Sequence, residues 1–384
     1  RGDHELYCAG HLIEAAVAYD KATGKHKFLD VMKKYVDCIE RAFITQKTAA
    51  FHTCGHEEIE LALIKLYDYT GAKKYLDMAM FFIDERGTRN EPWSNEWNTN
   101  YDQSAVPVRS LERAEGHAVR AVYLYTAMSE AYVHTGDEQL LAACNRLFED
   151  ITLRKMYITG GIGSAKNGEA FTVAYDLPNL EAYSESCAAL GLQLFALSMQ
   201  QTGPDARYAD VIERVMYNNM LSSTSLDGKA FFYENPLEIY LADVDKERHV
   251  LPERRTQLPI RHRLEVFNCS CCPPNINRIF ARVGDFFFSE TQDALVVNQY
   301  ACLTLANDKA DIKMITDYPV SGTIKFEIGK CAYKKIMLRK PFWCDNFTLE
   351  GADYTLNDGY IETDGGVGGF TLTFEMRPYF VKAR

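Results

Sequence analysis

The chain has 384 residues, a length sufficient for a large domain and a smaller one. Its residues are 47% hydrophobic and 25% charged, which is typical of a globular protein. Its net charge of −11 and its pI near 5.4 argue against nucleic acid or an anionic membrane surface as the main partner. No apolar run approaches the ~20 residues that a membrane-spanning helix requires. We therefore expect a globular protein that binds neither nucleic acid nor membrane.

The eleven cysteines are odd in number, and most stand singly in apolar helical stretches, as Cys38 and Cys144 do. This usage favours a reducing compartment, and hence a cytoplasmic location, over a disulfide scaffold. The chain opens at Arg1 without a methionine, so a signal peptide is not excluded. The sequence leaves open whether the chain forms a homodimer.

From Leu6 to about Asn219 the apolar residues recur at helical spacing, which predicts a mainly α region. Four Thr-Gly pairs, each followed by a further helical stretch, divide this region into four helical hairpins. A glycine suits the left-handed residue that ends a helix. The four glycines are Gly24, Gly71, Gly136 and Gly203. Their unequal spacing is typical of a barrel of helical hairpins with variable loops at one end.

The start of each hairpin carries polar residues that packing does not need. These groups are Gly10-His11, Gly55-His56, Gly116-His117 and Tyr183-Ser184-Glu185-Ser186-Cys187. Equivalent positions of hairpins arranged in a ring meet at one mouth, so these side chains should line one pit. A single histidine in such a place is more often a core or capping residue, but three equivalent ones favour a polar site.

Three cysteines fall within the stretch Cys269-Ser270-Cys271-Cys272-Pro273-Pro274, whose prolines should keep a helix from starting cleanly there. A disulfide, buried small residues, a metal site or an activated nucleophile could each explain the cluster. Together with Glu185 and Cys187, Cys271 and Cys272 would supply the four ligands of a tetrahedral zinc site. The spacing is not that of a zinc finger.

Two loops should lie over the expected pit. The glycine-rich loop Ile158–Ser164 lacks the Lys-Ser/Thr ending and the preceding strand of a phosphate-binding loop, so it more simply brings Glu169 over the pit. The loop Trp93–Trp97 has groups typical of a sugar-stacking rim, although ordinary loop packing explains them equally well. Tyr233 falls in an extended insertion, and His249–Arg263 is most simply a solvated basic loop.

After Leu295 the pattern becomes β-rich. The expected strands are Leu295–Tyr300, Ala301–Leu305, Gly322–Ile328 and Phe370–Glu375. We expect a catalytic helical domain over residues 1–290 and a β-sandwich domain over residues 291–384. The β segments join abruptly, which leaves open that the sandwich is incomplete.

Seven motifs occur in one order along the chain. They are Leu6–Ala16, Gly55–Ala62, Glu115–Arg120, Ile158–Gly163, Tyr175–Asn179, Glu185–Cys187 and Cys269–Asn275. Together they closely resemble glycoside hydrolase family 127, the β-L-arabinofuranosidase family. The resemblance implies a mainly α fold, an (α/α)6 barrel followed by β-sandwich modules. Because only four hairpins are clear, we expect the first hairpins of the barrel to precede Arg1.

The resemblance also implies roles for individual residues. It implies a zinc ion, Zn2+, held by Glu185, Cys187, Cys271 and Cys272. It implies that Cys271 is the nucleophile and that Glu169 is the general acid/base. It implies contacts to the sugar from His11, His56, His117 and Tyr233.

A thiolate nucleophile departs from the pair of carboxylates that retaining glycosidases usually carry. A free thiol with a pKa of ~8.5 is mostly protonated at neutral pH, whereas a metal-bound thiol is deprotonated. Zinc would therefore hold Cys271 ionised. Glu169 would protonate the departing oxygen and then deprotonate water. We expect the nearby anionic cluster to raise the pKa of the Glu169 carboxyl.

The leading hypothesis is a retaining exo-glycosidase that removes terminal β-L-arabinofuranose. Its partner would be a small carbohydrate or a plant-glycan oligosaccharide. One alternative is a glycosidase of the same barrel acting on another pectic sugar. A second is a non-catalytic, zinc-containing sugar-binding protein. An epimerase that uses the histidines as acid and base would leave the cysteine cluster unexplained.

Overall fold

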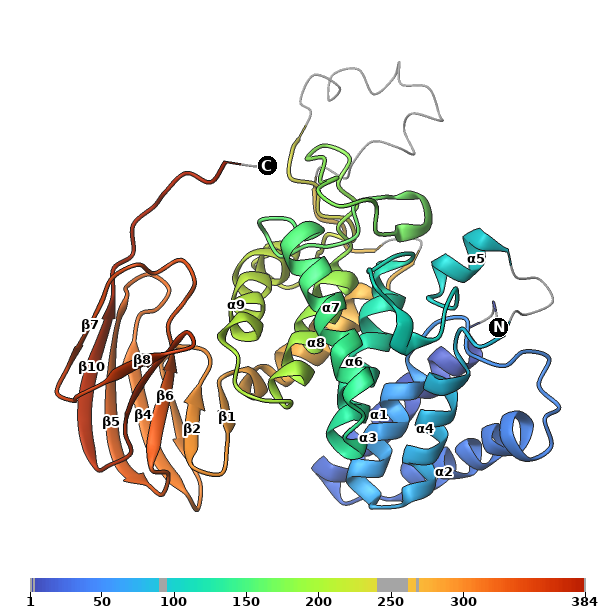
Figure 1. Ribbon diagram of the computed structural model, residues 1–384, viewed down its shortest axis with the longest axis horizontal. Coiled ribbons are helices and arrows are strands. Elements are labelled where there is room, and N and C mark those ends of the chain that lie inside the picture. The colour runs from blue at the N-terminus through green and yellow to red at the C-terminus, as the bar shows by residue number, and fades with distance from the viewer. Residues whose placement is uncertain (1, 3, 90–94, 240–261, 267–268, 383–384) are drawn as a thin grey trace.

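A helical part is followed by two β-sheets in the structure, a computed structural model that describes residues 2, 4–89, 95–239, 262–266 and 269–382 (Figure 1). The predicted order, mainly α and then β, is confirmed. Most of the predicted loop His249–Arg263 and the start of the predicted rim Trp93–Trp97 lie outside the described residues. Among the described helices, none is both long and apolar enough to cross a membrane.

The helical part contains four successive hairpins. They are α1 (Glu5–Thr23) with α2 (Lys27–Glu40), α3 (Ile59–Thr70) with α4 (Lys73–Glu85), α6 (Ala118–Thr135) with α7 (Glu138–Arg154), and α8 (Ser186–Gln200) with α9 (Ala206–Arg214). The helix α12 (Cys272–Ala281) follows on the far side of α8. The first helices of the hairpins pack side by side in the order α1, α3, α6, α8, α12. They form an inner layer, and the second helices lie outside them.

The inner position of α8 follows from its composition. Every residue of this helix except Leu197 is buried, as expected for a helix that is apolar on all sides. The outer helix α9 instead carries charged residues on one face and buries Tyr208, Val211 and Ile212 on the other. Shorter elements link the hairpins: η1 (Arg41–Thr45), α5 (Glu96–Tyr101), η2 (Val108–Ser110), η3 (Asn167–Glu169), η4 (Val215–Met220), α10 (Leu221–Ser223) and η7 (Val283–Phe286).

Three of the four predicted turn glycines end their helices in the left-handed conformation. Gly24, Gly71 and Gly136 have φ of 67°, 68° and 68°, and each donates its N–H to the carbonyl four residues earlier. The fourth prediction is wrong, because α8 ends at Gln200, before Gly203, and the residue that follows it, Gln201, is right-handed. The Thr-Gly pairs therefore predicted three of the helix ends correctly but not the end of the buried helix α8.

Two five-stranded sheets follow the helices, with the orders β1-β2-β6-β9-β8 and β3-β4-β5-β10-β7. The strands are β1 (Phe288–Glu290), β2 (Ala294–Val297), β3 (Leu303–Ala306), β4 (Ala310–Thr316), β5 (Thr323–Cys331), β6 (Lys335–Arg339), β7 (Phe347–Glu350), β8 (Thr355–Asn357), β9 (Tyr360–Asp364) and β10 (Gly368–Phe374). The pairing of β2 with β6 is parallel and the other pairings are antiparallel. Both sheets contribute to one apolar cluster, with Ile336 from one and Phe326 from the other.

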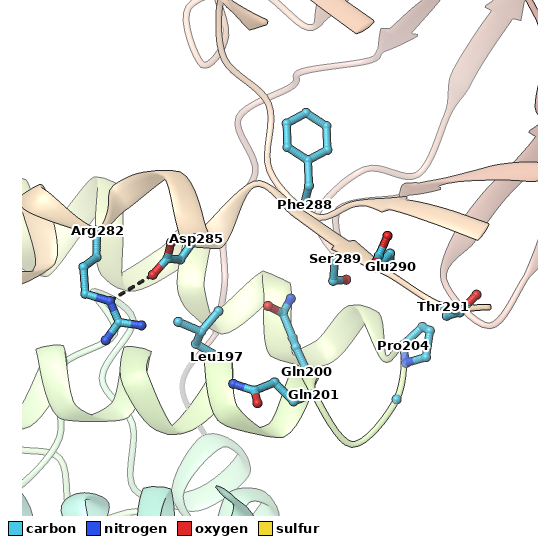
Figure 2. A pocket seen from close by; sticks show the side chains of 11 residues that line it. Leu197, Gln200, Gln201, Pro204, Arg282, Asp285, Phe288, Ser289, Glu290 and Thr291 are labelled. Carbon is cyan, nitrogen blue, oxygen red and sulfur yellow. Dashed lines mark hydrogen bonds and ion pairs between the residues drawn. The ribbon is translucent and has the colours of Figure 1, made fainter. Parts of the chain in front are cut away.

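A cleft of about 600 Å³ lies where the end of α8 meets β1 (Figure 2). Gln200, Gln201 and Pro204 line one side, and Arg282, which pairs with Asp285 at 2.9 Å, lies on the other. The cysteine-bearing start of α8 is about 20 Å away along the helix axis, given a rise of about 1.5 Å per residue. This cleft is therefore separate from the predicted pit.

A buried arginine joins the helices to the sheets. Arg339 of β6 is fully buried and binds Asp210 at 2.6 Å, Glu213, and the carbonyl oxygen of Asn298 at 2.6 Å. Glu213 also accepts a hydrogen bond of 2.6 Å from the Tyr318 hydroxyl. The two acidic residues lie on α9, so one guanidinium fixes the outer layer of helices against the first sheet.

We expect the substitution Arg339→Met to lower the free energy of unfolding by about 3–5 kcal/mol, because it leaves buried carboxylates without their counter-ion. Denaturant-induced unfolding would measure the loss. The matched control is Arg207→Met, which removes exposed pairs with Glu149 and Asp205 and should change stability by less than about 1 kcal/mol. Equal effects of the two substitutions would contradict a special role for the buried arginine.

Candidate functional site

The cysteine stretch begins a helix instead of preventing one. The helix α12 starts at Cys272 with its two prolines in the first turn, where the missing N–H groups have no partner within the helix anyway. The expectation that the prolines keep a helix from starting there is therefore wrong. Cys271 takes the N-cap position, so both sulfurs lie at the positive end of the helix.

A second helix begins at the same place. Glu185 is the N-cap of α8, and Cys187 is the second residue of that helix. Two helix N-termini thus bring together side chains that are more than 80 residues apart in sequence. Each terminus favours negative charge and thiolate character on the groups beside it.

The four predicted metal ligands lie together, with all of their ligand atoms within 4.8 Å of one another. Cys187 Sγ lies 3.6 Å from Cys271 Sγ and 3.5 Å from Cys272 Sγ. Glu185 Oε1 lies 3.6 Å and 3.8 Å from the same two sulfurs. Tetrahedral zinc with its usual bond lengths would hold sulfur and oxygen ligands about 3.5–3.8 Å apart, so the donor set fits such an ion.

The sulfur separations are far too long for a disulfide, and all eleven cysteines are free thiols. Hydrogen bonds from Cys187 and Cys272 lower the pKa of the Cys271 thiol to about 2. Hydrogen bonding to Cys271 raises the pKa of Cys187, and burial raises the pKa of Glu185. Only a cation would hold all of these groups as anions at once. The buried Glu185 Oε2 is also without a hydrogen-bond partner.

Glu169 lies beside this cluster on a strained piece of backbone. It ends η3 with φ of 51°, a left-handed conformation that non-glycine residues adopt mainly where the surroundings enforce it. Ala170 pairs with both Ala165 and His117 through backbone bridges, which hold the segment in place. Glu169, His117 and Glu185 have polar atoms within 4.8 Å of one another, so the predicted acid/base and metal site share one pocket.

Two donors fix the Glu169 carboxylate. His117 Nε2 lies 2.7 Å from Oε2, and the Tyr183 hydroxyl donates to Oε1 at 2.7 Å. Burial acts to raise the pKa of Glu169, but the hydrogen bonds and charge of His117 and the hydrogen bond from Tyr183 hold it below its usual value. The expectation of a raised pKa is therefore wrong, because these donors outweigh the anionic cluster.

The three histidines lie in one aromatic wall. The Tyr7 ring lies 4.5 Å from the His11 ring and 4.3 Å from the His56 ring, and His56 lies 5.5 Å from His117. His11 is not at the start of a hairpin, since α1 begins at Glu5. Its ring still joins the wall because Tyr7 precedes it by one helical turn, on the same face.

Tyr233 reaches the cluster from the insertion. Its carbonyl accepts the N–H of Ser186 at 2.9 Å, and Glu234 pairs with Glu185 in a backbone bridge. The Tyr233 hydroxyl lies 3.3 Å from Cys271 Sγ. Trp97, from the predicted rim, is 58% exposed and stacks on Tyr101 at 4.8 Å, so a flat aromatic face lies beside the pit.

Sequence reasoning placed two tyrosines of the site in its motifs but assigned them no role. Tyr183 stands two residues before Glu185 and binds Glu169, while Tyr7 stands four residues before His11. Helical spacing within the first motif could have identified Tyr7. Tyr183 could not have been found this way, because its contact depends on how the Glu169 loop folds back. Cys269 is exposed, but its thiol hydrogen-bonds with Cys271 and Tyr233 at the edge of the cluster.

The family model for the catalytic domain of the GH127 β-L-arabinofuranosidases matches residues 2–285. The chain belongs to this family. It is 34% identical over 411 residues to the non-reducing end β-L-arabinofuranosidase of Bifidobacterium longum subsp. longum, with 99% of the chain and 61% of that protein covered. The resemblance read from the seven motifs is therefore confirmed.

Solved structures of the family agree. A GH127 β-L-arabinofuranosidase from Geobacillus stearothermophilus, Ara127N-Se, superposes with a TM-score of 0.88 at 40% identity and covers 99% of this chain and 63% of its own. The GH127 β-arabinofuranosidase BT3674 superposes with a TM-score of 0.86 at 35% identity, and the match covers 99% of this chain and 61% of BT3674. This family member thus spans about three fifths of the length of its relatives.

We expect the cluster to bind one divalent metal ion in tetrahedral geometry. Cobalt(II) exchanged into the protein should give the sulfur-to-cobalt charge-transfer absorption of a thiolate site, and Cys272→Ser should weaken it because one thiolate ligand is lost. Cys302→Ser is the matched control, since this exposed thiol lies outside the four-residue cluster. Loss of the absorption in the control alone would contradict the assignment.

Proposed function

We propose that this GH127 chain is the catalytic part of a retaining exo-glycosidase that hydrolyses terminal β-L-arabinofuranosides. Family membership and the names of its relatives support the substrate class. One observation carries the chemistry: the Cys271 sulfur lies within 3.6 Å of Cys187 and Glu185 and within 3.3 Å of the Tyr233 hydroxyl. A carboxyl suited to proton transfer, Glu169, lies in the same pocket.

Zinc is the ion that this donor set suits best, since three sulfurs and one carboxylate at tetrahedral distances are ligands it commonly takes. Zinc bound by Glu185, Cys187, Cys271 and Cys272 would keep the sulfurs as thiolates at neutral pH. The two helix N-termini act in the same direction on Cys187 and Cys271. The thiolate of Cys271 is therefore available as a nucleophile.

In the first step the Cys271 sulfur attacks the anomeric carbon, and the bond from that carbon to the departing oxygen breaks. Glu169, in its protonated form, gives its proton to that oxygen. In the second step Glu169 takes a proton from water, whose oxygen attacks the same carbon and releases the sugar and the Cys271 thiolate. Two displacements at one carbon retain its configuration.

Glu169 must be protonated for the first step, although in the free site its pKa is lowered. Its side chain is 36% exposed, so a bound glycoside would remove the remaining contact with water. Further burial raises the pKa of a carboxyl. His117 and Tyr183 each keep one Glu169 oxygen in a fixed place during these changes.

The histidine wall would bind the sugar. His11, His56 and His117 surround the space next to Tyr7, and Trp97 offers a face on which a ring can stack. We assign the sugar contacts to these three histidines and to Tyr233. The preferred partner is a small carbohydrate or a plant-glycan oligosaccharide.

The inner layer of α1, α3, α6, α8 and α12 and the outer layer of second helices suit part of an (α/α)6 barrel. We propose this architecture for residues 1–290 and a β-sandwich for residues 291–384. The first strand of the sheets, β1, begins at Phe288, close to the proposed boundary.

We expect Cys271→Ser to lower the release of L-arabinose from an aryl β-L-arabinofuranoside by at least ~10³-fold, because a serine hydroxyl is a far weaker nucleophile than a thiolate. Mass spectrometry of the trapped wild-type protein should find the sugar on Cys271. Cys302→Ser, at an exposed thiol outside the site, should keep its activity. Turnover by Cys271→Ser near the wild-type rate would refute the mechanism. If the wild-type protein hydrolyses only a different furanoside or a pyranoside, the substrate is another pectic sugar.

We expect Glu169→Gln to lower kcat by about 10²–10⁴-fold, the usual contribution of a general acid/base. With a dinitrophenyl glycoside, the first step of Glu169→Gln should be slowed less than with other glycosides, because the dinitrophenolate leaving group needs no proton. Release of the phenol and of the sugar, followed separately, would show this difference. Binding of an aryl β-L-arabinofuranoside by the wild-type protein without its hydrolysis would instead indicate a non-catalytic sugar-binding protein.

A further inference from the structure

The three histidines of the pit differ in the group that each Nδ1 atom contacts. His56 Nδ1 lies 3.0 Å from the carbonyl oxygen of Glu57, which can only accept, so the proton of this imidazole is on Nδ1. His117 Nδ1 accepts the N–H groups of Val119 and Arg120 at 3.2 Å and 3.4 Å, so its proton is on Nε2. In a neutral imidazole the other nitrogen then has the opposite role.

His11 faces a carboxyl group instead of the backbone. Its Nδ1 lies 3.1 Å from Glu58 Oε1, a buried oxygen that no other hydrogen-bond donor among the described residues satisfies, and 3.8 Å from Glu14 Oε2. A carboxylate or the carbonyl oxygen of a carboxylic acid would accept from this nitrogen, whereas an acid O–H would donate to it. The state of Glu58 therefore decides which nitrogen of His11 carries the proton.

The neighbours of Glu58 settle its state. Glu58 is fully buried next to Glu14, and Glu14 contacts both Lys65 and Arg278. Of two adjacent buried carboxyls, one has a strongly raised pKa. Lys65 and Arg278 both contact Glu14 closely, whereas Glu58 has only Arg278, at 3.9 Å, so the negative charge is favoured on Glu14. Glu58 therefore keeps its proton and donates it to Glu14, which leaves its carbonyl oxygen as an acceptor for His11.

A glycine provides the space for this contact. A Cβ atom on Gly10 would lie 2.5 Å from Glu58 Cγ and 3.0 Å from the Glu58 backbone carbon. Gly10 lies inside α1, where glycine costs about 1 kcal/mol relative to alanine. The helix itself therefore gains nothing from this glycine, and the close approach of Glu58 to α1 accounts for it.

We propose that Glu58 is a positioning residue of the sugar site, which accepts Nδ1–H of His11 and so makes His11 Nε2 a hydrogen-bond acceptor for a hydroxyl of the substrate. The inference rests on the proposed sugar-binding function of the pit. His56 has the same tautomer, and both rings contact Tyr7. The site thus presents two neighbouring imidazole acceptors, which select a sugar with two free hydroxyl donors.

The substitution Glu58→Gln tests this arrangement, because the amide reproduces both contacts of the protonated acid. Its carbonyl accepts from His11 and its NH2 donates to Glu14, so KM should stay within about threefold of the wild type. Glu58→Leu removes the acceptor, and KM should rise about tenfold, with a smaller change in kcat, as expected for one lost hydrogen bond. Gly10→Ala should raise KM in the same way while leaving the α1 helix intact.

The tautomer can be observed directly. Long-range proton–nitrogen correlation spectra of ¹⁵N-histidine-labelled protein, with His11 assigned from a His11→Gln variant, should show the His11 proton on Nδ1 in the wild type and in Glu58→Gln. In Gly10→Ala this preference should weaken. A His11 proton on Nε2 in the wild type, or a folded Glu58→Leu variant with wild-type KM, would overturn the proposal.

The two hypotheses can fail separately. The spectra need no substrate, so they test the role of Glu58 even if the chain hydrolyses no arabinofuranoside. If Glu58→Leu does not fold, the wild-type spectrum and the Gly10→Ala variant still decide. If turnover is normal but the tautomer is wrong, only the positioning role of Glu58 is refuted.

Discussion

Four acidic ligand atoms lie within 4.8 Å of one another in a buried place, and the remainder of the site depends on this crowding. Without a cation the protons must be shared among Glu185 and the three cysteines, and the pKa of Cys271 falls while that of Cys187 rises. A divalent ion removes this conflict, since it favours the anionic form of every ligand. Binding of the ion should therefore stabilise the packing of α8 against α12.

The same constraint explains how the chain is routed around the cluster. Cys187 and Cys272 belong to the first turns of two helices that pack against each other. The segments that carry Tyr233 and Glu169 are then fixed to the start of α8 and α6 by backbone bridges at Glu185 and His117. A functional side chain is thus placed by rigid helix ends and by short backbone pairings, which need no regular sheet.

Local chemistry made part of this structure predictable. Thr-Gly pairs identified three helix ends because a left-handed residue is needed there and glycine adopts it readily. The hairpin pattern placed Glu185 and Cys187 at the start of a helix, which is the start of α8. Two errors lie where several segments meet: the end of α8 at Gln200, and the pKa of Glu169, which two distant donors control. Neither depends on neighbours in sequence alone. The error over the prolines of α12 was local, since the first turn of a helix accepts proline.

The segment His56-Glu57-Glu58-Ile59-Glu60 is buried although it carries four ionisable side chains. Two other parts of the chain balance these glutamates. Arg86 lies 2.8 Å from Glu57 and 3.2 Å from Glu60, and the Glu58 proton is directed to Glu14. Buried ion pairs of this kind add little net stability, since desolvation offsets their attraction. These contacts instead fix geometry, since they hold the histidines at defined positions near α3. Hydrophobic packing alone would not define the orientation of each imidazole.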